Sequence, residues 1–138
     1  MLTPATFHDL KDASVFITGG GNGIGAALTE GFAEQGARVA FVGRSDATAF
    51  CDAIGRRHGN RPLFLPCDVT DTAALQAAMA RAAAAHGPLD VLVANAANDT
   101  RIKADDVTEA WWDDSQAVNL RHYFFAAQTA AAMMRPGG

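Results

Sequence analysis

The sequence predicts an α/β fold in which a parallel β-sheet lies between layers of helices, the doubly wound arrangement. Four short, almost wholly apolar runs carry this prediction, and they lie at Val15–Ile17, Val39–Val42, Leu63–Leu65 and Val91–Val93. Each run is too short for a helix and lacks the alternation of a half-exposed strand, which is typical of buried parallel strands. Stretches with helical spacing separate the runs, and this alternation builds right-handed βαβ units. We expect about four strands in the order 3-2-1-4.

Three helices are expected between these strands, and a glycine follows each of them. The first ends at Gln35-Gly36, and the second runs from about Ala47 to His58 before Gly59. The third has Thr70 or Asp71 as its N-cap and closes at Gly87-Pro88. The apolar residues that mark the helical spacing are Ile24, Leu28 and Phe32, then the inward-facing Phe50 and Ile54, then Leu75 and Met79.

A polar loop follows the fourth strand from Asn95 to about Asp106, and one long helix is expected from about Val107 to Met134. The turn residues Arg135-Pro136-Gly137-Gly138 end it. Its aromatic residues favour core packing and a subunit contact, which suggests a homo-oligomer formed through this helix. His122 is interpreted as structural. The aromatic residues are Trp111, Trp112, Tyr123, Phe124 and Phe125.

Length and charge limit the class of protein. The 138 residues suggest a single domain, residues 1–138, with 11 basic and 15 acidic residues and a net charge of -4. No run of Lys and Arg forms a basic stripe, so nucleic acid and anionic membranes are not expected partners. The two cysteines, Cys51 and Cys67, have no metal-ligand spacing, and no metal site is expected. Neither a leader nor a run of ~18 apolar residues is found, so we expect a cytoplasmic protein.

The most informative motif is the glycine-rich turn between the first strand and the first helix. Glycines let an anion and the facing backbone come close, and the helix N-terminus offers unpaired N–H groups. This order suits the phosphates of a dinucleotide, whereas a Walker loop is excluded because no Lys-Ser/Thr pair follows the last glycine. The alternative is a turn that is merely tight. The candidate cofactor-binding residues here are Thr18, Gly19, Gly21, Asn22, Gly23 and Ile24.

The residue after the second strand bears on the choice between NAD(H) and NADP(H). A dinucleotide-binding fold that selects NAD(H) usually places an acid there, to bind the ribose 2′-hydroxyl. This chain has Gly43 followed by Arg44, whose guanidinium suits a 2′-phosphate. Arg44 therefore favours NADP(H), with NAD(H) as the alternative cofactor and a solvated loop arginine as the bland interpretation.

The spacing Thr18-Gly19-x-x-x-Gly23-Ile24-Gly25 resembles the TGxxxGxG signature of the short-chain dehydrogenase/reductase family. The resemblance implies a Rossmann-type sheet, here truncated to about four strands. It places Asp68 against the adenine amino group with Val69 beside the ring, although Asp68 could simply be a capping or turn carboxylate.

The resemblance continues into the second half of the chain. Asn95 and Ala96 correspond to the family's loop along the nicotinamide ribose, and Ala97 departs from its usual glycine. Asn119, in Val118-Asn119-Leu120, is the candidate catalytic residue. The family's asparagine at this position distorts the helix and helps hold a proton relay; an ordinary helix asparagine is the alternative.

The family transfers a hydride between nicotinamide and an alcohol or carbonyl group, and it uses a serine and a Tyr-x-x-x-Lys pair to do so. The Tyr-x-x-x-Lys pair does not occur here, because the single tyrosine, Tyr123, is followed four positions later by Ala127. The resemblance places this pair and the catalytic serine after Gly138. We therefore expect an NAD(P)-binding domain that is incomplete at its C-terminus and inactive alone. A narrower similarity, to members that oxidise sugars such as D-xylose, suggests a small-molecule sugar substrate. The alternative is a non-catalytic dinucleotide-binding or subunit-interaction module.

Overall fold

The computed structural model describes residues 5–138, and its centre is one parallel sheet. The strands are β1 (Ser14–Thr18), β2 (Arg38–Gly43), β3 (Leu63–Pro66) and β4 (Val91–Ala94), in the order β3-β2-β1-β4. Every neighbouring pair is parallel. The α/β class and the strand order 3-2-1-4 predicted from the sequence are confirmed.

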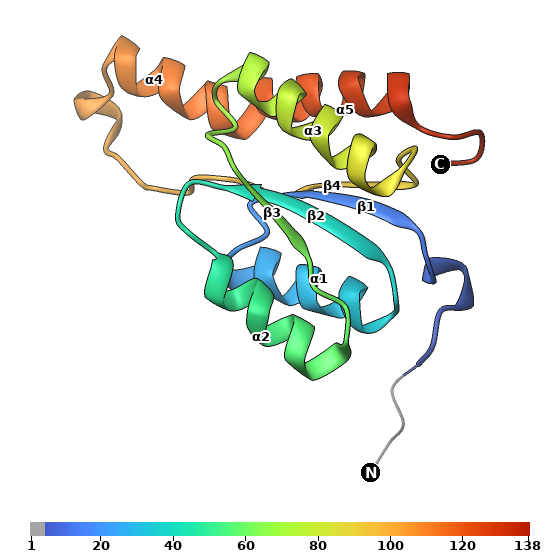
Figure 1. The fold of residues 1–138 in the computed structure, drawn as a ribbon. Helices are drawn as coiled ribbons and strands as arrows, with labels where there is room; N and C mark the ends of the chain where they lie inside the picture. The colour runs from blue at the N-terminus through green and yellow to red at the C-terminus, as the bar shows by residue number, and fades with distance from the viewer. Residues whose placement is uncertain (1–4) are drawn as a thin grey trace.

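Helices cover both faces of the sheet (Figure 1). Helices α1 (Gly23–Glu34) and α2 (Thr48–His58) lie on one face, and α3 (Thr72–His86) and α5 (His122–Met133) lie on the other. Each interface has its own apolar core, one around Phe41 and Ile54 and the other around Phe16, Leu75 and Met79. The sheet is thus the shared wall of two cores, which fixes the strands relative to one another.

The helix ends follow the chemistry that the sequence indicates. Gly36, Gly59 and Gly87 all have positive φ, at 84°, 68° and 85°, a region that glycine enters without strain. Between the two candidate N-caps of α3, the structure selects Asp71, whose Oδ1 accepts a hydrogen bond from the backbone N of Ala74 at 2.9 Å.

Two expectations about burial need correction. The edge strands β3 and β4 are mostly half-exposed rather than buried, because each has only one neighbouring strand among the described residues. In α1 the fully buried positions are Gly25, Thr29 and Ala33, whereas Ile24 is 77% exposed. The close approach of Gly25 to the loop turns that face of the helix inward, and Ile24 faces away from the core.

Helix is present along most of the predicted stretch from Val107 to Met134, with a π-helical turn in its middle. A short 3₁₀ turn, η2 (Ala104–Asp106), is followed by α4 (Glu109–Gln116), a π-helical segment η3 (Ala117–Arg121), and α5. Thr108 caps α4 by accepting from the backbone N of Trp111, which sets the start two residues later than predicted. The only other short turn described is η1 (His8–Leu10).

The aromatic residues of this helical stretch do not form core. Trp112 and Phe124 are 57% and 61% exposed, and the rings of Phe124 and Phe125 meet edge to face at 5.2 Å. Large exposed apolar side chains of this kind are typical of contact surfaces. Within residues 5–138, no helix has the length and apolar character needed to cross a bilayer.

We predict that the fold loses stability as the pH falls from 7 to 5. Burial lowers the pKa of His122, and burial together with the charge of Arg38 lowers the pKa of His86. Below the ordinary histidine pKa of about 6.5 the unfolded chain therefore binds protons that the native chain does not, and the free energy of unfolding decreases. Urea denaturation followed by circular dichroism at several pH values measures this slope.

The double variant His86→Gln/His122→Gln should flatten the pH dependence, whereas His8→Gln, at an exposed position, should leave it unchanged. The lowered pKa values of Glu30 and Asp68 act in a different window, because stability from these carboxylates is lost only below about pH 4.5. Constant stability between pH 7 and pH 5 would contradict the assignment of neutral buried histidines.

Candidate functional site

The candidate residues meet at one edge of the sheet, where all four strands end. Thr18 at the end of β1 pairs with Val42 on β2 and Ala94 on β4, and Gly43 pairs with Pro66 on β3. In a parallel sheet of this topology the connections leaving these ends form the usual crevice for a ligand. The glycine loop, Arg44, Asp68 and Asn95 all leave from this edge.

The glycine loop packs so closely that space dictates three of its glycines, Gly19, Gly20 and Gly25; a Cβ on Gly20 would lie 2.5 Å from Cβ of Phe41. A Cβ on Gly25 would lie 1.8 Å from the carbonyl oxygen of Gly19, far inside contact distance. Gly19 itself has φ +70°, and a Cβ there would lie 3.0 Å from Cα of Ala96. On the helix side, the hydroxyl of Thr29 in α1 donates to the carbonyl of Gly20 at 2.9 Å. This bond and the contact at Gly25 hold α1 directly under the loop.

The N-terminus of α1 remains open to an anion. Asn22 occupies the N-cap position but makes no side-chain capping bond, and the first turn contains no acidic residue. Its backbone N–H groups and partial positive charge are therefore not neutralised by the chain. The exposed side chain of Ile24 lies at this same end of the helix. Asn22 and Gly23 are exposed at this end of the helix, and Gly21 is half-buried.

Thr18 and Asn95 join the glycine loop to the segment after β4. The hydroxyl of Thr18 accepts from the backbone N of Asn95 at 2.9 Å and of Ala96 at 3.1 Å. The Asn95 side-chain amide donates in return to the carbonyls of Thr18 and Gly19, both at 3.1 Å. These four bonds make the two loops one rigid unit, so Asn95 holds the cradle as well as bordering it.

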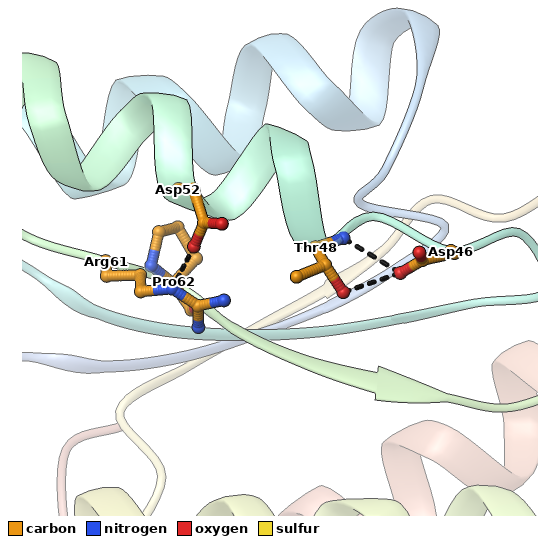
Figure 2. Close-up of polar contacts among 5 residues, drawn as sticks. All are labelled: Asp46, Thr48, Asp52, Arg61 and Pro62. Carbon is orange, nitrogen blue, oxygen red and sulfur yellow. Dashed lines mark hydrogen bonds and ion pairs between the residues drawn. The ribbon is translucent and has the colours of Figure 1, made fainter.

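The segment after β2 places Arg44 on the surface beside the site and then turns into α2. Asp46 shapes this turn, because its Oδ1 accepts from the backbone N and the hydroxyl of Thr48 at 3.0 and 2.6 Å (Figure 2). These bonds lower the pKa of Asp46. Figure 2 also shows Arg61 donating to Asp52 at 2.8 Å, which ties α2 to the start of β3.

Asp68 lies after β3, and its Oδ1 accepts from the backbone N of Thr70 at 2.9 Å and from the Thr70 hydroxyl at 2.7 Å. These bonds, and to a smaller extent the charge of Arg44, lower the pKa of Asp68, so this carboxylate is ionised at neutral pH. The turn role considered from the sequence is real, and it uses one carboxylate oxygen. The side chain of Val69 is buried in the core, which leaves its backbone as the part that borders the site.

Asn119 lies in the π-helical segment and reaches the loop after β4. Its Oδ1 accepts from the backbone N of Asn98 at 2.9 Å, and its Nδ2 donates to the Asn98 carbonyl at 2.8 Å. Ser115 is a weaker partner at 3.3 Å. Ala97 adopts an ordinary conformation, since Asp12 is the one non-glycine residue with positive φ among residues 5–138. The departure from the family's glycine therefore creates no backbone strain here.

Sequence reasoning missed the link from His122 to the glycine loop. His122 is 1% exposed, and its Nε2 lies 2.9 Å from the hydroxyl oxygen of Thr18, 104 positions away in the sequence. Its Nδ1 lies 2.6 Å from the carbonyl oxygen of Val118. The spacing of His122, Ala126 and Ala130 on the buried face of α5 was the available signal, because it predicts that the histidine points toward the sheet.

Comparison with known proteins supports the resemblance. Curated relatives include a "probable galactose dehydrogenase" of Rhizobium meliloti, 47% identical over 99% of this chain and 55% of its own length. They also include a D-xylose 1-dehydrogenase of Caulobacter vibrioides, 42% identical over 99% of this chain and 54% of its own length. The chain spans about half the length of the curated relatives it matches.

Solved structures agree with the fold. A short chain dehydrogenase from Burkholderia cenocepacia in complex with NADP matches with a TM-score of 0.88 and 35% identity, over 94% of this chain and 54% of that one. The family profile described as short chain dehydrogenase matches residues 13–138. With this match and the TGxxxGxG loop in its expected geometry, the chain belongs to the short-chain dehydrogenase family.

Proposed function

We propose that this chain forms the dinucleotide-binding part of an oxidoreductase that transfers a hydride between NADP(H) and a sugar or related alcohol. The observation that carries the proposal is the cradle at the start of α1. Gly25 lies against Gly19 with no room for a side chain, and the N-terminus of α1 is uncapped. A pyrophosphate needs this combination of close backbone approach and unpaired N–H groups.

Each candidate residue has a role in this proposal. Residues 21–24 hold the pyrophosphate through backbone N–H groups, because those of Gly19 and Gly20 already donate to the carbonyl of Val42. Thr18 and Gly19 shape the cradle, and Ile24 covers the exposed side. Asp68 and the backbone of Val69 border the adenine, and Asn95 and Ala96 border the nicotinamide ribose. A bound nicotinamide would supply the hydride acceptor or donor, and the residues present here position it.

The preference for NADP(H) rests on charge at the end of β2. Gly43 leaves no acid to bind or repel at the ribose 2′ position, and Arg44 follows it. Arg44 is exposed and close enough to Asp68 to influence the pKa of that carboxylate. A guanidinium beside the adenosine end is suited to a 2′-phosphate through charge-assisted hydrogen bonds. Related structures contain NADP and NADPH, which supports the same choice.

The sugar substrate is inferred from the relatives, which carry the names of galactose and D-xylose dehydrogenases. The exposed apolar surface along α4 and α5, with Trp112, Leu120 and Phe124, supports assembly of the protein as a homo-oligomer through these helices. A non-catalytic dinucleotide-binding or subunit-interaction module is the second candidate, because the uncapped cradle could hold a cofactor without itself supplying a reacting group.

The first prediction concerns Arg44. Titration followed by nicotinamide fluorescence should show tighter binding of NADPH than of NADH, and Arg44→Ala should weaken NADPH binding by about 10- to 100-fold, as expected for charge-assisted hydrogen bonds. NADH binding should barely change. Arg56→Ala is the matched control and should have no effect, because Arg56 is also an exposed arginine but lies on α2. An unchanged preference in Arg44→Ala would remove the role assigned to this residue.

The second prediction concerns Asn119, which we propose acts by positioning the loop at Asn98. In the full-length protein, Asn119→Ala removes both hydrogen bonds to that backbone and should lower kcat by about ten-fold with little change in NADPH affinity. Asn119→Asp keeps the acceptor for the Asn98 N–H and should recover part of the loss. Gln128→Ala, at an exposed amide on α5, is the control. Equal activity of wild type and Asn119→Ala would contradict the proposal.

The third prediction separates the two candidate functions. The full-length protein should reduce NADP⁺ in the presence of D-galactose or D-xylose, measured by absorbance of the reduced nicotinamide. NADPH binding without turnover on any sugar or simple alcohol would instead favour the non-catalytic module.

A further inference from the structure

We propose that His122 is a positioning residue for the dinucleotide site, acting by accepting a hydrogen bond from the Thr18 hydroxyl at Nε2. This inference rests on the proposed function and extends it to a residue outside the glycine motif.

The tautomer of His122 follows from its surroundings. Nδ1 lies 2.6 Å from the carbonyl oxygen of Val118, which can only accept, so Nδ1 carries the proton. In a neutral ring Nε2 is then an acceptor, and the Thr18 hydroxyl at 2.9 Å must donate to it.

The Thr18 hydroxyl is then fully used. Its single proton goes to His122, and its oxygen accepts from the backbone N–H groups of Asn95 and Ala96. A hydroxyl has one donor and two acceptor positions, and all three are filled. If His122 presented an N–H at Nε2, the oxygen would face three donors and its proton would have no acceptor in this set. The neutral Nδ1–H form of His122 is therefore the one that lets Thr18 hold the segment after β4.

The π-helical segment carries the other end of the hydrogen-bonded series that runs from Thr18 through His122 to Val118. The backbone N–H of His122 donates to Ala117, five residues back, instead of to Val118, four residues back as in an α-helix. This shift leaves the Val118 carbonyl accessible to the His122 ring. The same segment carries Asn119, which holds the loop at Asn98. Through His122 the start of the glycine loop is tied to the element that positions the other side of the site.

The first test reads the histidine directly and needs no bound cofactor. NMR of the ring nitrogens in the full-length protein at neutral pH should show His122 as the neutral Nδ1–H tautomer. Thr18→Val, which removes the hydroxyl, should shift the resonance of the acceptor nitrogen Nε2, and Thr18→Ser should leave it close to that of wild type. An Nε2–H tautomer, or no response to Thr18→Val, would overturn the inference.

The second test measures NADPH affinity by fluorescence titration. His122→Phe keeps a ring but no acceptor, and it should weaken binding about five- to ten-fold, the range expected for one buried hydrogen bond. His122→Gln offers an amide oxygen to Thr18 and should recover most of the affinity. His86→Gln, at a histidine on the opposite edge of the sheet, is the control and should bind as wild type does.

A double-mutant cycle separates positioning from simple packing. In the Thr18→Val background, His122→Phe should cause no further loss, because the bond is already absent. Equal losses in both backgrounds would mean that the ring only fills space and would overturn the inference. Failure of the wild type to bind NADPH would instead count against the proposed function, and the ring-nitrogen measurement would still decide the link between His122 and Thr18.

Discussion

The buried hydroxyl of Thr18 is the contact on which the geometry of the site edge depends. It lies at the end of β1, between the glycine loop that follows it and the segment that follows β4, and it meets a side chain from α5. An unsatisfied hydroxyl in such a buried place would cost about 1–3 kcal/mol, so its three partners are mutually constrained. The cradle is consequently held by side-chain contacts between distant segments as well as by the glycines.

The glycines contribute what side chains cannot. At Gly25 and Gly19 the backbones touch so closely that the helix begins directly under the loop, which aims its N–H groups at the space above. Because Asn22 does not cap them and the first turn has no acid, this end of α1 keeps its positive potential. Beside the start of α1, Arg44 adds a positive charge and Asp68 a negative one. Because these charges follow different strands of the sheet, they give different parts of the site different charge.

Much of this could be predicted from the sequence, and the reasons are local. The strands are apolar runs, the helix ends are glycines with positive φ, and the TGxxxGxG spacing is a contiguous pattern. What the sequence did not reveal depends on contacts between distant segments. The half-exposed edge strands and the bond from His122 to Thr18 both follow from how elements meet in space, whereas the distortion of the long helix at Asn119 was implied by the family resemblance. For Asp68 the sequence allows both a turn role and a contact with adenine. In the structure the turn contact is made by one carboxylate oxygen, Oδ1, and does not use the second oxygen.

The π-helical segment orients His122 in a way that a regular α-helix would not. In an α-helix the backbone N–H of His122 would donate to the carbonyl of Val118, and this carbonyl would point along the helix axis toward that N–H. One extra residue in the turn moves that N–H to Ala117 and lets the ring use Val118, which orients the buried histidine. The exposed face of the same turn presents Asn119 to the backbone of Asn98. A single local irregularity thus fixes two side chains three residues apart, His122 toward the glycine loop and Asn119 toward the loop after β4. An irregular helical turn of this kind persists only where surrounding contacts favour it. The contacts of His122 and Asn119 both favour this turn, which supports a role for it in the site.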